Sequence, residues 1–204
     1  MIDFHNHILP NIDDGSKSFD MSIEMLSDAS KQGITEVVNT VHYQHPKFEK
    51  KRIDFDRINS LKNELQYELK SRGISIKLHL GAEVFYFPNL LKILNEPLVT
   101  IGEGKYMLIE FYPQIIPDSH KQQLFDLKMA GVTPIIAHPE RYKFVQENIE
   151  MVTEWLEAGC IIQIDAGSPL GLLGNKSKIT SIEIIKNNWF QIVGSDAHDN
   201  NNRR

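Results

Sequence analysis

Residues 1–15 of the 204-residue chain are MIDFHNHILPNIDDG, and this stretch distinguishes between two folds that the rest of the sequence allows. Ile2 to His5 form a short apolar run that is typical of a buried β-strand. In an open, doubly wound sheet that binds a dinucleotide, a glycine-rich phosphate loop follows the first strand. Here a histidine, a proline and two aspartates follow instead. The stretch therefore favours a barrel, with the open sheet as the alternative.

A repeated apolar pattern extends this prediction along the chain. Seven apolar runs predict strands at residues 2–5, 35–42, 74–83, 106–111, 133–138, 160–165 and 190–196. Six helical segments are expected between them, among them residues 18–33, 55–73 and 148–159. Glycines fit the left-handed cap at four predicted helix ends: Gly33, Gly73, Gly131 and Gly159. Strand alternating with helix predicts parallel βα units, and the length predicts one α/β domain over residues 1–204.

Composition excludes several classes of protein. Hydrophobic residues make up 41% and charged residues 24%, as in ordinary globular proteins. No apolar run approaches the roughly 20 residues of a membrane span, and no signal peptide is visible. The net charge of −5 and the lack of a basic stripe argue against nucleic-acid binding. A single cysteine, Cys160, excludes an internal disulfide and predicts a cytoplasmic protein.

Potential metal ligands occur at the ends of six of the seven predicted strands. Residues two apart on a strand share a face, so Asp3, His5 and His7 face the same side. The strand ends of a barrel converge on one mouth, where barrel enzymes hold their chemistry. The full candidate set is His5, His7, Asp14, His42, Glu83, Glu110, His138, Asp196 and His198.

The size and chemistry of this set indicate a metal centre with more than one ion. A lone histidine or aspartate at a strand end is usually a capping or surface residue, but two H-x-H or D-x-H pairs with further strand-end ligands are hard to explain that way. Mixed nitrogen and oxygen ligands suit Mn, Zn or Fe. Nine ligands exceed what one ion accepts, so two or three ions sharing carboxylates are expected.

Other residues with similar chemistry lack this context. His120 lies in a polar helical stretch and is predicted to be a surface residue. His79 lies within a strand and His45 in a loop, so we expect structural or solvent-facing roles for both. Asp165 ends the sixth strand in a weaker context and stays unassigned. Cys160 opens an apolar strand, where a buried and inert thiol is expected.

Two arginines near the ligand motifs indicate phosphate binding. Arg141 follows His138 in HPER, and Arg203 lies five residues after His198. A guanidinium group matches a pair of phosphoryl oxygens in fork geometry. Cysteine-dependent phosphate chemistry needs an arginine six residues after the cysteine, and Ala166 occupies that position after Cys160. The sequence thus favours a metal centre with phosphate-binding arginines over cysteine-dependent chemistry.

The chain resembles the polymerase-and-histidinol-phosphatase (PHP) superfamily, and within it the bacterial protein-tyrosine phosphatases of capsular and exopolysaccharide gene clusters. The resemblance rests on DFHNHILPNIDDG, TVH at 40–42, GAE at 81–83, LIEF at 108–111, IIAHPER at 135–141 and GSDAH at 194–198. It implies a distorted (β/α)₇ TIM-like barrel whose last C-terminal helices would follow Arg204. It also implies three metal ions, usually Mn²⁺, with Fe, Zn, Co or Mg as alternatives, and phosphate binding by Arg141 and Arg203.

The resemblance also implies how the ligands divide and what the substrate is. One ion would be held by His5, His7, Glu83 and Asp196, a second by Glu83, Glu110 and His138, and a third by Asp14, His42 and His198. The implied substrate is a phosphotyrosine protein, the tyrosine-rich tail of a bacterial tyrosine autokinase that regulates capsular and exopolysaccharide biosynthesis. A small-molecule phosphatase, such as histidinol-phosphate phosphatase, is the alternative.

Overall fold

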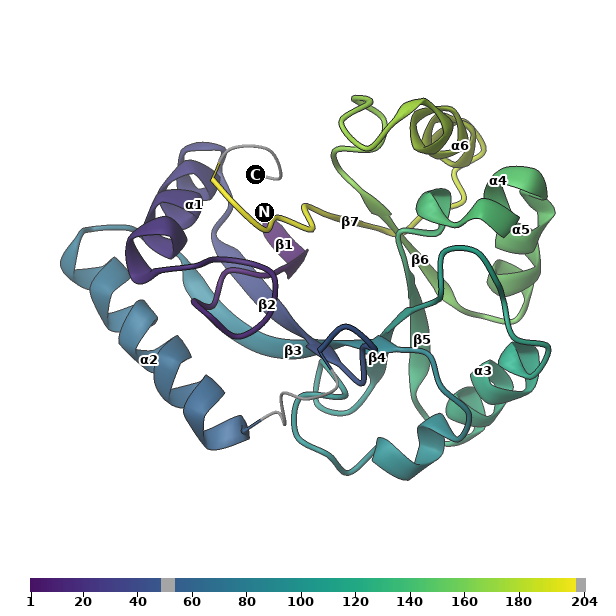
Figure 1. The fold of residues 1–204 in the computed structure, drawn as a ribbon, viewed down its shortest axis with the longest axis horizontal. Helices are drawn as coiled ribbons and strands as arrows, with labels where there is room; N and C mark the ends of the chain where they lie inside the picture. Colours follow the sequence, from purple (N-terminus) through teal and green to yellow (C-terminus); the bar gives the residue numbers. More distant parts are fainter. Residues whose placement is uncertain (49–53, 201–204) are drawn as a thin grey trace. The chain divides into compact units, whose positions relative to one another are not determined.

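The computed structural model describes residues 1–48 and 54–200, so the predicted phosphate-binding residue Arg203 lies outside the described residues. Within them, strands and helices alternate along the chain (Figure 1). The strands are β1 (Ile2–Asn6), β2 (Glu36–Tyr43), β3 (Lys77–Phe85), β4 (Tyr106–Glu110), β5 (Thr133–Ala137), β6 (Ile161–Asp165) and β7 (Ile192–Gly194). All seven predicted strands are therefore present, with ends shifted by at most three residues.

The helices occupy the connections between the strands. They are α1 (Phe19–Lys31), α2 (Phe55–Ser71), α3 (His120–Met129), α4 (Lys143–Glu147), α5 (Glu150–Glu157) and α6 (Asn175–Lys186), with short 3₁₀ helices η1 (Leu90–Ile93) and η2 (Pro139–Arg141). Gly33 and Gly159 end α1 and α5 with φ values of +85° and +77°, which favour glycine. None of the helices in the described part of the chain is long and apolar enough to cross a membrane.

The order of the strands distinguishes this sheet from an open, doubly wound one. The seven strands neighbour one another in the order of the chain, from β1 to β7. The registered pairs, such as β4 with β5 and β5 with β6, are parallel. A doubly wound sheet reverses its strand order at a switch point, and no such reversal occurs in the described strands. The alternative of an open dinucleotide-binding sheet is therefore wrong.

The chain divides into two compact units. The first unit comprises residues 1–82 and 194–204, and the second comprises residues 83–193. The single domain expected from chain length stays a prediction.

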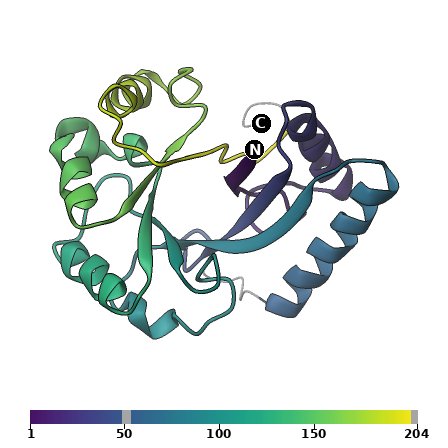
Figure 2. The same ribbon diagram turned by 180° about the vertical axis from the view of Figure 1, so that it is seen from behind.

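The first unit packs two helices on its parallel strands. β1 pairs with β2, and α1 and α2 lie on the same side of these strands (Figures 1 and 2). The side chains of Ser18 and Asp54 cap the two helices by accepting hydrogen bonds from backbone N–H groups of the first turn. Leu26 and Leu65 are among the buried side chains that these helices contribute to the core.

The second unit is built on strands β4 to β6, with helices α3 to α6 beside them (Figure 2). An aromatic cluster holds the loops after β4 and β5 in place. The rings of Phe111 and Trp155 stack with centroids 5.8 Å apart, and Tyr142 meets Phe111 edge-on at 6.1 Å. The backbone N–H of Phe111 donates to the Tyr142 hydroxyl at 2.9 Å, and Tyr142 is fully buried. The chain after β5 is therefore anchored next to the predicted ligand His138.

The prediction that His120 is a surface residue is wrong. Its side chain is buried, and the rings of Phe111 and Trp155 meet it edge-on. Nδ1 lies 2.8 Å from the carbonyl oxygen of Pro117, and burial lowers the pKa of the imidazole. The buried residues of α3 are His120, Leu124 and Leu127, which have the i, i+4, i+7 spacing of one helix face. His120 belongs to that face although its neighbours in sequence are polar.

Cys160 is buried, as predicted. Burial raises the pKa of its thiol to about 12, so the thiolate is not formed near neutral pH.

Candidate metal centre and phosphate pocket

The first unit brings six predicted ligands into one cluster, called here the histidine cluster: His5, His7, Asp14, His42, Asp196 and His198. Ligand atoms of His7, Asp14, His42 and His198 all lie within 4.8 Å of one another. Ligand atoms of His5, His7 and Asp196 also lie within 4.8 Å of one another, so His7 is common to both groups.

The pairwise distances show two carboxylates placed between imidazoles. Asp14 Oδ1 lies 3.3 Å from Nε2 of both His42 and His198. Asp196 Oδ1 lies 3.5 Å from His5 Nε2 and 3.4 Å from His7 Nε2. Nitrogen and carboxylate ligands bind a transition metal at about 2.0–2.2 Å, which places two ligands of one ion within roughly 4.4 Å of each other. The cluster therefore has the donors and the spacing that a divalent ion needs.

Local backbone structure explains why β1 presents both histidines. The N–H of His7 donates to the carbonyl of Ala197 at 2.9 Å, and the N–H of Asp196 donates to the carbonyl of His5 at 2.8 Å. Asp3 accepts hydrogen bonds from the N–H and hydroxyl of Ser195 at 3.0 and 2.6 Å. Asp3, His5 and His7, which were predicted to share one face, are all buried. Asp3 thus has a positioning role, because it fixes the segment that carries Asp196.

Asp13 contacts a predicted ligand, His7, and the sequence reasoning did not single it out. One of its oxygens lies 2.9 Å from His7 Nδ1, and the other accepts from the N–H of Gly15 at 3.0 Å. Burial alone would raise the pKa of this carboxyl, but the interactions with His7 and His42 lower it to about 2. A metal-binding histidine commonly gives its second nitrogen to a carboxylate, which fixes the ring and its tautomer. The position of Asp13 six residues after His7, in DDG, was the available signal.

The loop after β1 has no space for a side chain at Gly15. A Cβ at Gly15 would lie 2.0 Å from the carbonyl oxygen of His7, so only glycine fits this close approach. Asp14, the next residue back, is half-buried and accepts a hydrogen bond from Lys47 Nζ at 2.9 Å. Burial opposes its ionisation, but hydrogen bonds from His198, His42 and Lys47 hold the pKa of Asp14 well below its usual range. The carboxylate is therefore ionised and ready to bind a cation.

The second unit holds the remaining three predicted ligands, Glu83, Glu110 and His138. His138 Nε2 lies 2.9 Å from Glu83 Oε1, and both side chains are buried. His138 follows β5 with a φ of +32°, a conformation that is costly for a non-glycine residue. In the first unit Asp196 has a similar φ of +46°. Backbone strain of this kind concentrates at functional sites.

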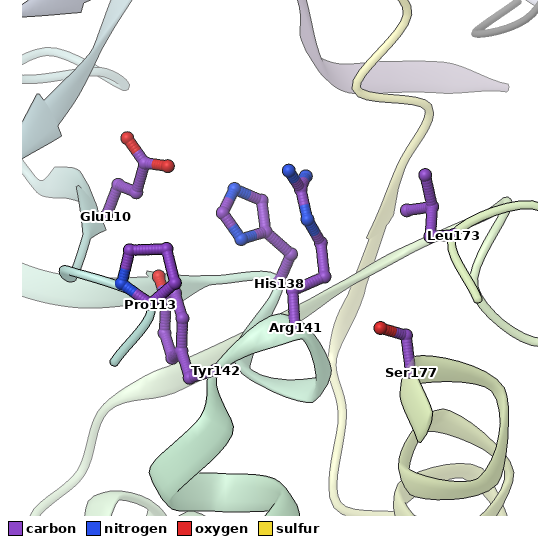
Figure 3. A pocket seen from close by; sticks show the side chains of 7 residues that line it. All are labelled: Glu110, Pro113, His138, Arg141, Tyr142, Leu173 and Ser177. Atoms are coloured by element: carbon purple, nitrogen blue, oxygen red, sulfur yellow. The ribbon is translucent and has the colours of Figure 1, made fainter. Parts of the chain in front are cut away.

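A pocket of about 280 Å³ opens beside His138 in the second unit, and Glu110 and Arg141 also line it. The side chains of Glu110, His138 and Arg141 extend to the same side (Figure 3). Pro113, Tyr142, Leu173 and Ser177 complete the lining. Arg141 Nη1 lies 3.6 Å from Asp165 Oδ2, so the unassigned Asp165 is a buried partner of the predicted phosphate-binding arginine. The pocket therefore combines metal-type donors with a guanidinium group, called here the phosphate pocket.

Glu140 shapes the loop below this pocket. It is fully buried, and its Oε1 accepts hydrogen bonds from the N–H of Asp165 at 2.9 Å and from the Ser168 hydroxyl at 2.7 Å. Burial raises the pKa of Glu140 to about 7, although these hydrogen bonds oppose the shift. In HPER, the glutamate thus fixes the loop after β6 while the histidine and arginine face the pocket.

Two other histidines are placed as expected. His79 pairs with Glu36 at 2.7 Å on a half-exposed part of the first unit. His45 lies in the loop after β2, where its ring is 4.7 Å from that of His42.

Comparison with known proteins identifies the relatives of this chain. CapC of Staphylococcus aureus is 35% identical over 204 residues, which cover 100% of this chain and 79% of CapC. The tyrosine-protein phosphatase YwqE of Bacillus subtilis is 32% identical over 200 residues, covering 98% of this chain and 78% of YwqE. Crystal structures of YwqE and of CpsB from Streptococcus pneumoniae are described as metal-dependent tyrosine phosphatases. The matched structure has a TM-score of 0.92 at 31% identity and covers 100% of this chain and 82% of that chain.

A more distant match supports the fold class alone. A Listeria monocytogenes protein assigned to the histidinol phosphatases is 12% identical, with a TM-score of 0.54 over 99% of this chain and 97% of that chain. The α/β fold with parallel strands is confirmed. The family model for capsular polysaccharide synthesis, CpsB/CapC, matches residues 1–204, and the chain belongs to this family.

Proposed function

We propose that this chain is a metal-dependent protein-tyrosine phosphatase, which hydrolyses phosphotyrosine in a protein substrate. The observation that carries the proposal is the phosphate pocket, where metal-type donors and Arg141 line one cavity. Such a combination suits the hydrolysis of a phosphate monoester, because metal ions held by these donors and the guanidinium group would both neutralise charge on the phosphoryl oxygens. The restriction to tyrosine is supported by the names of the family members, which are tyrosine-protein phosphatases.

We further propose that all nine predicted ligands bind the metal ions. The histidine cluster fits this role by its donor chemistry and by the mutual distances of its ligand atoms. Glu83, Glu110 and His138 would supply the ligands from the second unit. The ligand set has no thiolate and several carboxylates, which suits manganese. When bound, such ions act as Lewis acids on the phosphoryl group and lower the pKa of water.

The other residues have roles that do not depend on the ions. Arg141 would bind the phosphoryl oxygens and stabilise the charge that grows on them in the transition state. Asp165 would hold the guanidinium in place, since it lies 3.6 Å away. Asp13 would keep His7 in the tautomer whose Nε2 faces the cluster. Arg203, outside the described residues, would be a second phosphate ligand, as the family resemblance implies.

The family supports a proposal for the substrate, and the cysteine content supports one for the compartment. Because the family model concerns capsular polysaccharide synthesis, the proposed substrate is the phosphorylated tail of a tyrosine autokinase that regulates capsular and exopolysaccharide biosynthesis. We place the reaction in the cytoplasm, which the single, unpaired and buried cysteine supports.

The test combines metal analysis with a choice of substrates. Purified protein is assayed for bound Mn, Fe, Zn, Co and Mg, and then for turnover of a tyrosine-phosphorylated peptide and of histidinol phosphate. We expect chelation to abolish turnover of the peptide and Mn²⁺ to restore it. Full activity in the metal-free protein would contradict the metal-dependent mechanism. A clear preference for histidinol phosphate would favour a small-molecule phosphatase instead.

A further inference from the structure

Two apolar residues stand on either side of the phosphate pocket. Pro113 belongs to the loop after β4 and Leu173 to the loop after β6, and both line the pocket. His138 and Arg141 lie between them (Figure 3). The polar groups that suit a phosphate therefore have an apolar wall on each side. A phosphoserine or an alkyl phosphate has no ring to fill the space between such walls.

We infer that Pro113 and Leu173 hold the aromatic ring of a phosphotyrosine, and that exposed apolar residues of the same two loops bind apolar residues next to it in the substrate. This inference rests on the proposed phosphatase function and adds the residues that select the substrate.

The size of the pocket agrees with such an occupant. An apolar cavity of about 150 Å³ is sufficient to bind benzene. The phosphate pocket measures about 280 Å³, so its volume exceeds that of such a cavity.

Both walls are fixed to the same segment of chain, residues 138–143. The carbonyl of Pro113 accepts a hydrogen bond from the N–H of Lys143 at 2.7 Å. On the other side, Glu140 binds the hydroxyl of Ser168 at 2.7 Å, and the loop closes with a bond from the N–H of Leu172 to the carbonyl of Gly167 at 3.1 Å. The walls are thus positioned relative to His138 and Arg141 before a substrate arrives. Such pre-organisation reduces the entropy cost of binding.

The loops continue outward with apolar side chains that the fold does not bury. Ile115 is 66% exposed and Tyr112 is 51% exposed in the loop after β4. Leu170 and Leu172 are 72% and 67% exposed in the loop after β6. Exposed apolar residues that lie together mark an interaction site. Tyr112 and Leu172 are each next in the chain to a residue that lines the pocket, Pro113 and Leu173. The occupant that we infer is therefore the peptide around a phosphotyrosine, with apolar residues beside the tyrosine.

The experiment uses three variants and three substrates of the full chain. Leu173→Ala shortens one wall, Leu172→Ser changes an exposed loop residue, and Met129→Ser changes an exposed apolar residue of α3 as a matched control. The substrates are a phosphotyrosine peptide with leucine on each side, the same peptide with glycine on each side, and glycerol 2-phosphate. Binding of both peptides is measured separately by fluorescence anisotropy, with a non-hydrolysable phosphonate in place of the phosphate.

Leu173→Ala should lower kcat/KM for both peptides about tenfold or more, as lost contacts in an apolar pocket do, and should spare glycerol 2-phosphate. Leu172→Ser should weaken turnover and phosphonate binding only for the peptide with leucines. Met129→Ser should change nothing. The inference is overturned if Leu172→Ser changes the turnover of both peptides alike or of neither. It is also overturned if Leu173→Ala lowers kcat/KM equally for all three substrates. If the unaltered chain hydrolyses no phosphotyrosine peptide, the proposed function itself fails, which is a separate result.

Discussion

The histidine cluster of the first unit and the phosphate pocket of the second unit differ in their chemistry. The histidine cluster contains four imidazoles and two carboxylates, and its inner residues, such as His5 and His7, are fully buried. The phosphate pocket has one histidine, one glutamate and an arginine, with apolar residues and open volume. A cluster without cationic side chains of its own suits metal ions, whereas a cavity with a guanidinium suits an anionic substrate. We therefore propose that the histidine cluster holds metal, whereas the phosphate pocket adds a phosphate-binding guanidinium to its own metal ligands.

The largest expected effect comes from His7→Ala, because His7 belongs to both ligand groups of the histidine cluster. Loss of bound metal would remove several kcal/mol of transition-state stabilisation, about 10³-fold in kcat. Metal content by mass spectrometry should fall together with the rate. His79→Ala is the matched control, since His79 pairs with Glu36 outside the cluster, and it should retain both metal and activity. Equal losses in the two variants would mean that the cluster has been misassigned.

Arg141→Ala should separate the two regions most clearly. Arginine is not a metal ligand, so the metal content should stay unchanged, while removal of one charge-stabilising donor costs about 10²–10³ in kcat. Lys143→Ala removes a neighbouring exposed cation and keeps the backbone N–H that binds Pro113, so it should retain most activity. If Arg141→Ala loses its metal, the division between metal holding and phosphate holding does not stand.

A smaller effect is expected from Asp13→Asn, which tests how the histidine cluster is oriented. Loss of a carboxylate behind a metal-binding histidine typically lowers metal affinity 10–100-fold. The pKa of Asp13 is lowered to about 2 in the folded chain, so the ionised carboxylate stabilises the fold at pH values above its ordinary pKa of 3.8. That effect is lost as the pH falls towards 2. Thermal unfolding of the metal-free chain should therefore depend less on pH in this range for Asp13→Asn, and an unchanged dependence would contradict the orienting role.

Most of the fold was predictable from the sequence because strands alternate with helical segments. Each apolar run also ends near a polar residue, which had to face either solvent or a site. The family resemblance implied that His5 and Asp196 share one ion, and their side chains are 3.5 Å apart. The prediction from the sequence failed for His120, where a polar neighbourhood hid the apolar face shared with Leu124 and Leu127. Sequence reasoning also missed Asp13 and left Asp165 unassigned. Asp13 contacts His7 and Asp165 contacts Arg141, and residue type does not reveal these tertiary contacts.

The smallest expected effect is that of Cys160→Ser on activity, and it tests whether the chemistry of either region involves the thiol. Cys160 is buried, and the raised pKa of about 12 keeps it protonated, so turnover and metal content should be nearly unchanged. The substitution should still change how stability responds to alkaline pH. In the folded chain the thiol keeps its proton, whereas the unfolded chain loses it above a pKa of 9.0, so stability falls as the pH rises above 9. This part of the fall should disappear in Cys160→Ser when unfolding is followed by urea titration at pH 8 and pH 10. A large loss of phosphatase activity in the variant, with its metal retained, would instead point to chemistry at the sulfur and would contradict the roles assigned to both regions.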